Sequence, residues 1–255
     1  MSSIGIFDHF RIWFMLGMND VRMRYRRSFL GPFWATISMA VTIAALAFVY
    51  SSIFKIDLKV YVPLVGISYI VWGYIATSIN EAATVFIESA NLIQTSNINF
   101  ATYIFRTMLR NFVFFLHNLV LVPFIYLIFD QKISLEILLL FPGIIIFMLN
   151  IFWISAVVGF ISARYRDIPQ IINALVQIGF FVSPIMWRRS QISDHLANFL
   201  DWNFFAIFLD LMRAPLLSET IESRIWIVSL ISGVVGTALT IGLSQKIKSK
   251  MPFYL

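Results

Sequence analysis

Six long apolar stretches without a single charged side chain constrain this chain more than any other feature. About 20 consecutive apolar residues cross a bilayer as a helix, so each stretch is long enough to span. They are Ser28–Phe54, Val60–Asn80, Asn111–Phe129, Ile137–Ala163, Ile168–Trp187 and Ile225–Gln245. The third helix is expected to begin earlier, near Phe100, with Arg106 and Arg110 at the membrane interface. The predicted spans are therefore 31–54, 60–80, 100–129, 137–163, 168–187 and 225–245.

The composition agrees with a membrane protein over the whole length. Of 255 residues 60% are hydrophobic and 13% charged, whereas a soluble domain carries about 25% charge, and the mean hydropathy is +0.84. We expect one all-α polytopic domain over 1–255. The absence of cysteine excludes disulfides, thiolate zinc sites and cysteine nucleophiles. The first ten residues hold neither Lys nor Arg nor a short apolar core, so no cleaved signal peptide is expected.

The distribution of charge predicts the orientation. With the N-terminus in the cytoplasm, the cytoplasmic segments hold 12 basic and five acidic residues, a net charge of +7. The outer connections then hold seven basic and eight acidic residues, a net charge of −1. Basic residues are retained in the cytoplasm, which predicts a multi-pass protein with both termini there. Because the net charge of +6 is concentrated at membrane boundaries, it does not indicate nucleic-acid binding.

Two segments outside the spans are expected to lie at the membrane surface. Residues 6–26 have an apolar and a charged face, which is typical of an amphipathic helix in the interface plane. The outer connection at 189–222 mixes apolar stretches with Asp and Arg. Those stretches are too short to span, so we expect re-entrant or interfacial helices there.

A basic cluster stands between the amphipathic segment and the first span. Arg22, Arg24, Arg26 and Arg27 fall within six residues, just before the Leu30-Gly31 turn. They create a positive field where an anionic lipid headgroup would arrive. They also suffice to set the topology, and the two roles are compatible.

Other polar residues allow two interpretations each. The segment 81–99 is either a solvated loop or a short helix that docks on a soluble partner. Arg106 and Arg110, four residues apart, either extend toward the interface or contact an anionic headgroup or partner. His117 and Asn118, inside the third span, either hydrogen-bond a neighbouring helix or contact a substrate.

Aromatic residues make up 16% of the chain. Tyr and Trp near the ends of spans are typical of the interfacial belt. Some are also candidates to line a conduit, since sugar rings stack on aromatic faces. The conduit candidates are Trp34, Tyr50, Tyr69, Trp72, Phe181 and Trp187.

The chemistry that is missing narrows the function. None of the six charge-free stretches contains Asp or Glu, which argues against an ion-coupled carrier. No phosphate-binding Gly-rich loop, HExxH or GxSxG motif occurs, so energy for uphill transport must come from another chain. A membrane-embedded transferase would need a catalytic carboxylate or histidine cluster at a membrane face, where only scattered Asp and Glu occur.

Five motifs in order resemble the permease subunits of ABC-2-type polysaccharide exporters, notably the O-antigen transporters. The motifs are RYRRSFLGPFW at 24–34, RNFVFFLHNLV at 110–120, ARYRDIPQI at 163–171, FFVSPIMW at 180–187 and FLDLMRAPLL at 208–217. The chain departs from the family at 202–204, where it has Trp-Asn-Phe in place of the usual Asn-Pro.

The resemblance implies a non-catalytic channel-forming subunit in the bacterial inner membrane that exports O-antigen on undecaprenyl diphosphate. Such a permease forms a homodimer and pairs with two copies of an ATP-binding cassette subunit, which binds ATP and Mg²⁺; no cofactor is expected in this chain. The interface helix and a helix around 84–97 would receive the motion of the ATPase. The implied coupling residues are Phe10, Trp13, Phe14, Glu88, Asn91 and Gln94. The Leu30-Gly31 turn and its arginines would receive the lipid-linked pyrophosphate. A capsule or teichoic-acid exporter, or a drug or lipid ABC-2 permease, remains an alternative.

Overall fold

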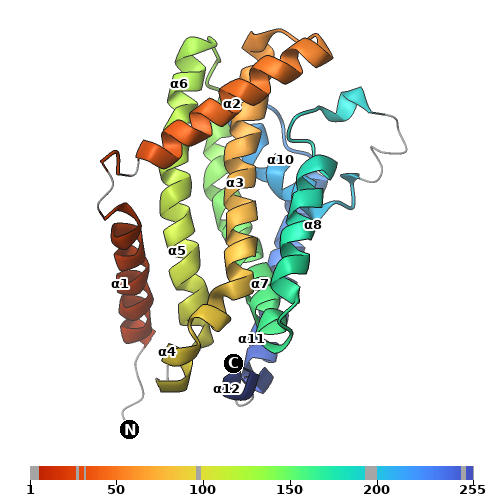
Figure 1. The fold of residues 1–255 in the computed structure, drawn as a ribbon. Helices are drawn as coiled ribbons and strands as arrows, with labels where there is room; N and C mark the ends of the chain where they lie inside the picture. Colours follow the sequence, from red (N-terminus) through yellow and green to blue (C-terminus); the bar gives the residue numbers. More distant parts are fainter. Residues whose placement is uncertain are drawn as a thin grey trace.

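The computed structural model describes residues 6–26, 29–31, 33–95, 99–192, 200–247 and 251–254, and these residues contain helices and no strand. The α-helices, with the labels of Figure 1, are α1 (Ile6–Tyr25), α2 (Phe33–Phe54), α3 (Leu58–Glu88), α4 (Ala90–Thr95), α5 (Phe100–Leu119), α6 (Leu121–Ile128), α7 (Leu140–Arg164), α8 (Ile168–Val182), α10 (Phe204–Leu216), α11 (Ser223–Ile247) and α12 (Met251–Tyr254). Two short 3-10 helices, η1 (Leu135–Leu139) and η2 (Arg189–Gln191), complete the described structure.

Five stretches are helical, long and apolar enough to cross a membrane: Phe33–Phe54, Leu58–Glu88, Phe100–Ile128, Leu135–Arg164 and Ser223–Ile247. They correspond to five of the six predicted spans. The remaining predicted span, the fifth in chain order at 168–187, is only partly helical, because α8 ends at Val182 after 15 residues. At 1.5 Å per residue α8 is roughly 22 Å long, shorter than the ~30 Å hydrocarbon core.

The chain after α8 is buried although it is not helical. Ser183 and Ile185 have no exposed surface. The hydroxyl of Tyr61 donates to the carbonyl of Met186 at 2.6 Å, and Arg213 donates to the carbonyl of Pro184 at 2.5 Å. These bonds satisfy backbone groups that a helix would otherwise pair internally.

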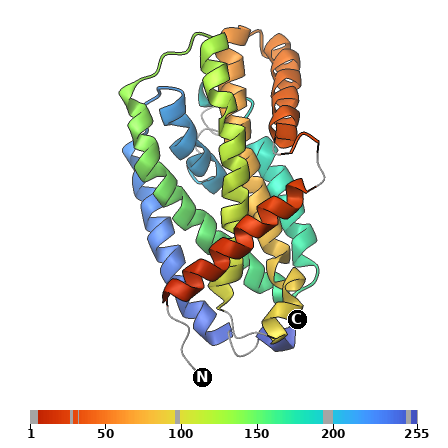
Figure 2. The same cartoon turned by 90° about the vertical axis from the view of Figure 1, so that its left-hand side faces the viewer.

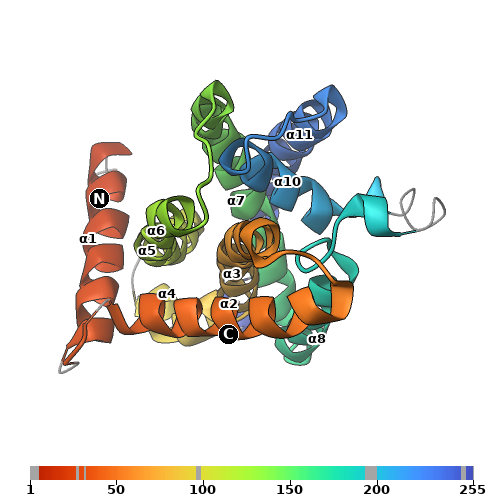
Figure 3. The ribbon, with the colours of Figure 1, turned by 90° about the horizontal axis from the view of Figure 1, so that it is seen from above.

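α3 is the central helix of the bundle (Figure 3). Most of its side chains are buried, and it packs against α2, α5, α7, α8 and α10. Asp57 caps its start by accepting from the backbone N–H of Lys59 at 2.7 Å. Its 31 residues give about 46 Å of helix, more than a bilayer core needs.

The prediction of a separate helix that begins near residue 84 is wrong. α3 continues through Glu88, and only the six residues of α4 form a separate helix. The third span is also divided, because α5 gives way to α6 at Val120. Pro123 lies in the first turn of α6, and its missing N–H and its ring disfavour a continuous helix from α5.

α1 crosses the outer side of α5 obliquely, as Figure 2 shows. It faces α5 with Gly17, where an added Cβ would lie 3.1 Å from the carbonyl oxygen of Arg106. Val21, one turn further along α1, is buried. α2 runs across the front of α3 and keeps most of its apolar side chains exposed (Figure 1).

α10 is the one α-helix described within the predicted re-entrant region 189–222. It is buried along most of its length between α3, α7 and α11. Asn203 caps its start by accepting from Phe205 N–H at 2.9 Å, so the Trp-Asn-Phe departure still provides a helix N-cap. The buried Arg213 fixes α10 in place through Asp210 on the same helix, the hydroxyl of Ser68 and the carbonyl of Pro184.

Candidate functional site: an arginine cluster beside a polar cavity

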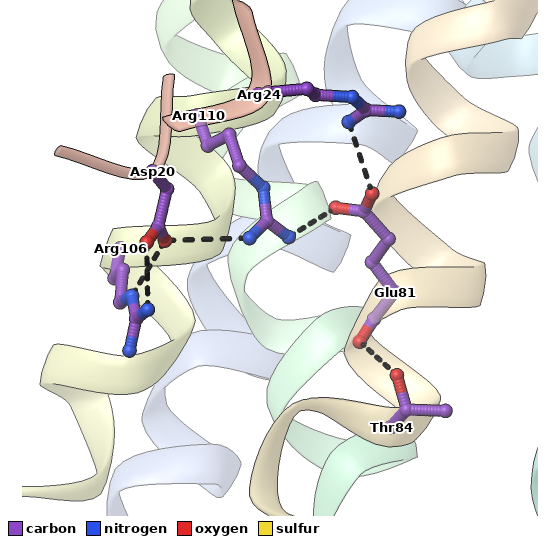
Figure 4. Close-up of polar contacts among 6 residues, drawn as sticks. All are labelled: Asp20, Arg24, Glu81, Thr84, Arg106 and Arg110. Atoms are coloured by element: carbon purple, nitrogen blue, oxygen red, sulfur yellow. Dashed lines mark hydrogen bonds and ion pairs between the residues drawn. The ribbon is translucent and has the colours of Figure 1, made fainter. Parts of the chain in front are cut away.

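Three arginines and two acids meet where α1 crosses α5, and one of the acids, Glu81, extends to this group from α3 (Figure 4). Arg106 donates from Nε and Nη2 to the two carboxylate oxygens of Asp20, at 2.6 and 2.7 Å. Arg110 joins both acids, with Nη1 3.4 Å from Asp20 and Nη2 2.6 Å from Glu81. Arg24 completes the cluster with Nη1 3.7 Å from Glu81. Three positive and two negative side chains leave the cluster with a net charge of +1.

The arginines of this cluster are not equally available to a ligand. The side chains of Arg106 and Arg110 are 24% and 21% exposed, and their ion pairs hold α5 to α1 and α3. This arrangement favours a structural role for both arginines, as partners of Asp20 and Glu81, over side chains that extend freely toward the membrane interface. Arg24 is 55% exposed and makes one long ion pair. Its guanidinium lies 4.6 Å from the ring centroid of Phe114, a cation–π contact.

The other residues of the predicted headgroup entrance lie at the end of α1 and in the turn that follows. Arg22 and Arg26 are exposed, and neither makes an ion pair within the described part of the chain. Arg27 lies outside the described residues. Leu30 is partly exposed. Gly31 has φ +53° and no atom within 4 Å of an added Cβ, so glycine is needed there for its conformation and not for space.

A cavity of about 190 Å³ adjoins Arg24. It lies between the end of α1, the first turns of α2, the middle of α3 and the second half of α5. Arg24, Tyr25, Asn111 and Asn118 contribute polar groups to its wall, and Tyr74 and Phe114 contribute aromatic rings.

Several polar atoms of the residues around this cavity are shielded from water and have no hydrogen-bond partner among the described residues. They are both amide atoms of Asn111, Oδ1 of Asn118 and the hydroxyl of Tyr25. Asn111 is only 2% exposed. Buried polar groups are nearly always paired, and an unpaired one costs about 1–3 kcal/mol. Burial raises the pKa of Tyr25 despite the opposing charge of Arg24, so this hydroxyl stays neutral and can both donate and accept.

The sequence interpretation missed Tyr25 and Asn111. The available signal was the spacing of Asn111 and Asn118, seven residues apart and hence on one face of α5. His117 has the more ordinary role, because its Nδ1 lies 2.7 Å from the carbonyl oxygen of Val113, one turn earlier in the same helix. Of the predicted pair, only Asn118 reaches the cavity.

The predicted conduit aromatics fall into three groups by exposure. Trp34 on α2 and Phe181 on α8 are 60% and 61% exposed. Tyr50, Tyr69 and Trp187 are partly buried. Trp72 is only 5% exposed and packs edge-on against Phe205, so its ring belongs to the core of this chain.

The predicted coupling residues lie on α1 and at the α3–α4 junction. Phe10 and Phe14 are exposed and stack on each other, while Trp13 is partly buried against Phe105. Glu88, Asn91 and Gln94 are exposed at one end of the bundle. Between them, Ile93 of α4 points into the core.

No group of three His, Cys, Asp or Glu side chains suited to a metal ion is found among the described residues. The site is thus a set of hydrogen-bonding and cationic groups beside aromatic rings. It is able to bind an anion and a neutral polar group next to each other.

Comparison with known proteins gives two relatives and no match to a family model. The chain is 20% identical over 237 residues to the O-antigen export system permease protein RfbA of Klebsiella pneumoniae, covering 90% of this chain and 89% of the relative. It is also 20% identical over 188 residues to the protein of the same name from Myxococcus xanthus, covering 72% and 71%. With five long apolar helices, the chain is a multi-pass membrane protein, and the relatives confirm the resemblance to O-antigen export permeases that its motifs predict.

Proposed function

We propose that this protein is the membrane-spanning, non-catalytic subunit of an ABC transporter that exports a lipid-linked polysaccharide across the bacterial inner membrane. The two relatives are named for O-antigen export. Our proposed substrate is therefore O-antigen, carried on undecaprenyl diphosphate as the resemblance of the motifs implies. A separate ATP-binding cassette subunit would bind ATP and Mg²⁺, two copies of it pairing with a homodimer of this chain.

Arg24 is the observation that carries this proposal. A guanidinium fork binds two phosphate oxygens at once, and the pairing strengthens where the dielectric is low. Phe114 holds the plane of the guanidinium from one side, and the long contact to Glu81 leaves donors for a headgroup. The turn with Gly31 follows α1 directly, so the headgroup would arrive between α1 and α2.

The same cluster supports a route for the motion of the ATPase. The proposed contact surfaces are the exposed face of α4 and the exposed Phe10 and Phe14 of α1. Because Asp20 joins α1 to α5, and Arg110 joins Asp20 to Glu81 on α3, a displacement of α1 would be transmitted to the side chains around Arg24.

The test is export in a deletion strain complemented with Arg24→Gln or with Lys246→Gln. Both changes remove one positive charge from the predicted cytoplasmic side, so both weaken the topology signal. We expect Arg24→Gln to abolish surface polysaccharide and to accumulate lipid-linked polymer inside the cell. Lys246→Gln, at an exposed lysine near the end of α11 that makes no ion pair among the described residues, should leave export near normal.

Equal export by the two variants, at equal protein level, would reject Arg24 as the headgroup site. Normal surface glycan in the deletion strain itself would reject polysaccharide export altogether. Loss of capsule or teichoic acid in place of O-antigen would select one of the alternative exporters. A change confined to drug resistance or lipid composition would select a drug or lipid permease.

A further inference from the structure

The polar groups in the cavity beside Arg24 are the strongest unexplained feature of this molecule. We propose that this cavity binds the sugar ring attached to the phosphate group of the substrate, a hexose that carries hydroxyl or acetamido groups. This inference rests on the proposed function, because it places the sugar next to a phosphate held by Arg24.

The mixture of unpaired donors and acceptors identifies the ligand class. A phosphate group offers acceptors only at neutral pH and needs donors around it. The residues around the cavity instead carry carbonyl oxygens, those of Asn111 and Asn118, that have no partner among the described residues and would repel a phosphate. These oxygens have almost no surface open to water, so a sugar ring would bind with both amides turned toward it. The amide nitrogen of Asn111 donates, and the neutral hydroxyl of Tyr25 does both. Hydroxyl and acetamido groups donate and accept, so they match this set.

The shape and the walls of the cavity agree with a ring. Its volume of about 190 Å³ is far above the ~10–15 Å³ that one water requires. Tyr74, Phe114 and Phe115 supply aromatic surface on which the apolar C–H face of a sugar can lie. Arg24 borders the same space, so the phosphate bonded to the ring would reach its guanidinium.

Asn150 shows how this fold treats an asparagine that is purely structural. It is fully buried in α7, and its Nδ2 donates to the carbonyl oxygens of Ile146 and Ser229 at 2.8 Å each. Its Oδ1 accepts from the indole N–H of Trp153 at 3.1 Å. Asn111 is buried to nearly the same degree and has none of these bonds. A leucine at 111 would therefore remove an unpaired amide from the core without breaking a contact.

The test measures binding to the purified full chain in lipid nanodiscs. The probes are farnesyl diphosphate and the same lipid carrying one hexose on its terminal phosphate. We expect the wild-type chain to bind the hexosyl probe about tenfold more tightly, as two or three additional hydrogen bonds would give. Asn111→Leu should bind both probes equally and keep or raise the wild-type melting temperature. Arg24→Gln should bind both probes more weakly.

A control at the structural Asn150, together with the behaviour of Arg24→Gln, separates the outcomes. Asn150→Leu should lower the melting temperature and, where it remains folded, retain the preference for the hexosyl probe. Equal binding of the two probes by the wild type, with both weakened in Arg24→Gln, would overturn the sugar site and leave the phosphate site intact; the cavity would then hold water only. A preference for hexose that survives in Asn111→Leu would overturn it as well. Failure of Arg24→Gln to weaken either probe would count against the proposed function itself.

Discussion

At the scale of single residues, Gly236 allows α11 to lie directly against the indole ring of Trp153 on α7. A Cβ at position 236 would fall 2.4 Å from a ring carbon of Trp153. The ring has little freedom to move away, because its N–H donates to Asn150 at 3.1 Å. Helices approach this closely in membranes only where one of them has a very small side chain.

We expect Gly236→Ala to lower the free energy of unfolding by about 1–3 kcal/mol, the usual cost of overpacking a core. The matched control is Gly242→Ala on the same helix, where an added Cβ meets no atom within 4 Å. Alanine there should be neutral or stabilise by up to about 1 kcal/mol through helix propensity. Unfolding in detergent, followed by circular dichroism, measures both; equal stability of the two variants would contradict the close contact.

The ion pairs of the arginine cluster give a second residue-scale prediction. Arg106→Gln removes a two-point contact to Asp20 that is largely shielded from water. We expect a loss of about 1–3 kcal/mol, less than the 3–5 kcal/mol for a fully buried pair. Arg24→Gln should cost about 0–1 kcal/mol, because the half-exposed Arg24 makes only a long contact.

Thermal unfolding of the two purified variants against the wild type checks this difference. If Arg24→Gln were as destabilising as Arg106→Gln, its expected export defect would have a structural origin. The pair of measurements therefore also decides how the export experiment is interpreted.

At the scale of helices, the apolar runs predicted what depends on the local sequence. α2, α5–α6, α7 and α11 occupy the expected stretches because length and hydropathy alone determine such spans. The end of α8 at Val182 depends instead on Tyr61 and Arg213, more than 100 and about 30 residues away, which bind the backbone of the buried segment 183–186. No local pattern contains that information.

The candidate site was predictable to a similar extent. The basic cluster before Gly31 is visible in the sequence, and it lies at the end of α1 that borders the cavity. Which arginine remains available is decided by Asp20 and Glu81, which bind Arg106 and Arg110 from other helices. The unpaired state of Asn111 is likewise a tertiary property, since the same residue in the same helix would be ordinary with a partner nearby.

The short helix α12 packs against both α4 and α7. Met251 is fully buried in the cluster that contains Ile93 of α4, and the Tyr254 hydroxyl accepts from Arg164 at 3.0 Å. We expect Met251→Ala to release α12 and to increase amide hydrogen exchange in residues 90–95 at least fivefold, with little change in α3. Met23→Ala, at an exposed methionine, is the matched control. Unchanged exchange in α4 would show that α12 does not restrain it.

The stability of the segment that precedes α10 should depend on pH. Asp201 accepts from Arg189 at 2.6 Å and from Arg224 at 2.5 Å, and these contacts lower the pKa of Asp201, chiefly through the hydrogen bond from Arg189. A lowered pKa in the folded protein adds stability that is complete above the ordinary value of about 4 and is lost as the pH falls through the folded pKa.

Hydrogen exchange of residues 200–224 at pH 7 and pH 3, corrected for intrinsic rates, measures this effect. We expect protection to fall at pH 3 in the wild type. Asp201→Asn should be less protected than the wild type at pH 7 and show a smaller change with pH. Identical pH profiles for the two proteins would contradict a role for this carboxylate.

At the scale of the whole molecule, the connections separate into two ends of one bundle. One end joins the start of α3, residues 131–132 and residues 218–219, through Gln131 to Lys59 at 3.3 Å and Ser218 to Lys132 at 2.9 Å. Arg188 lies at this end too, 3.7 Å from Glu219. The other end holds α4, α12 and the α7–α8 connection, where α12 packs against α4 and α7. Although α8 has only 15 residues, the chain between Arg164 and Arg188 thus passes from one end to the other.

This arrangement predicts six crossings of the membrane, the fifth completed by residues 183–187, of which 183–186 are buried. The chain has no cysteine, so single cysteines can be placed without removing any. Lys132→Cys and Gln191→Cys should both react with an impermeant maleimide in cells whose outer membrane has been permeabilised and whose inner membrane is intact. Gln94→Cys and Gln170→Cys should react only after the inner membrane is disrupted, because basic residues hold that end in the cytoplasm. If Gln191→Cys reacted only after the inner membrane is disrupted, α8 would return to the cytoplasmic side and the chain would cross the membrane five times. If Gln94→Cys reacted while the inner membrane is intact, the orientation of the bundle would be the opposite of the predicted one.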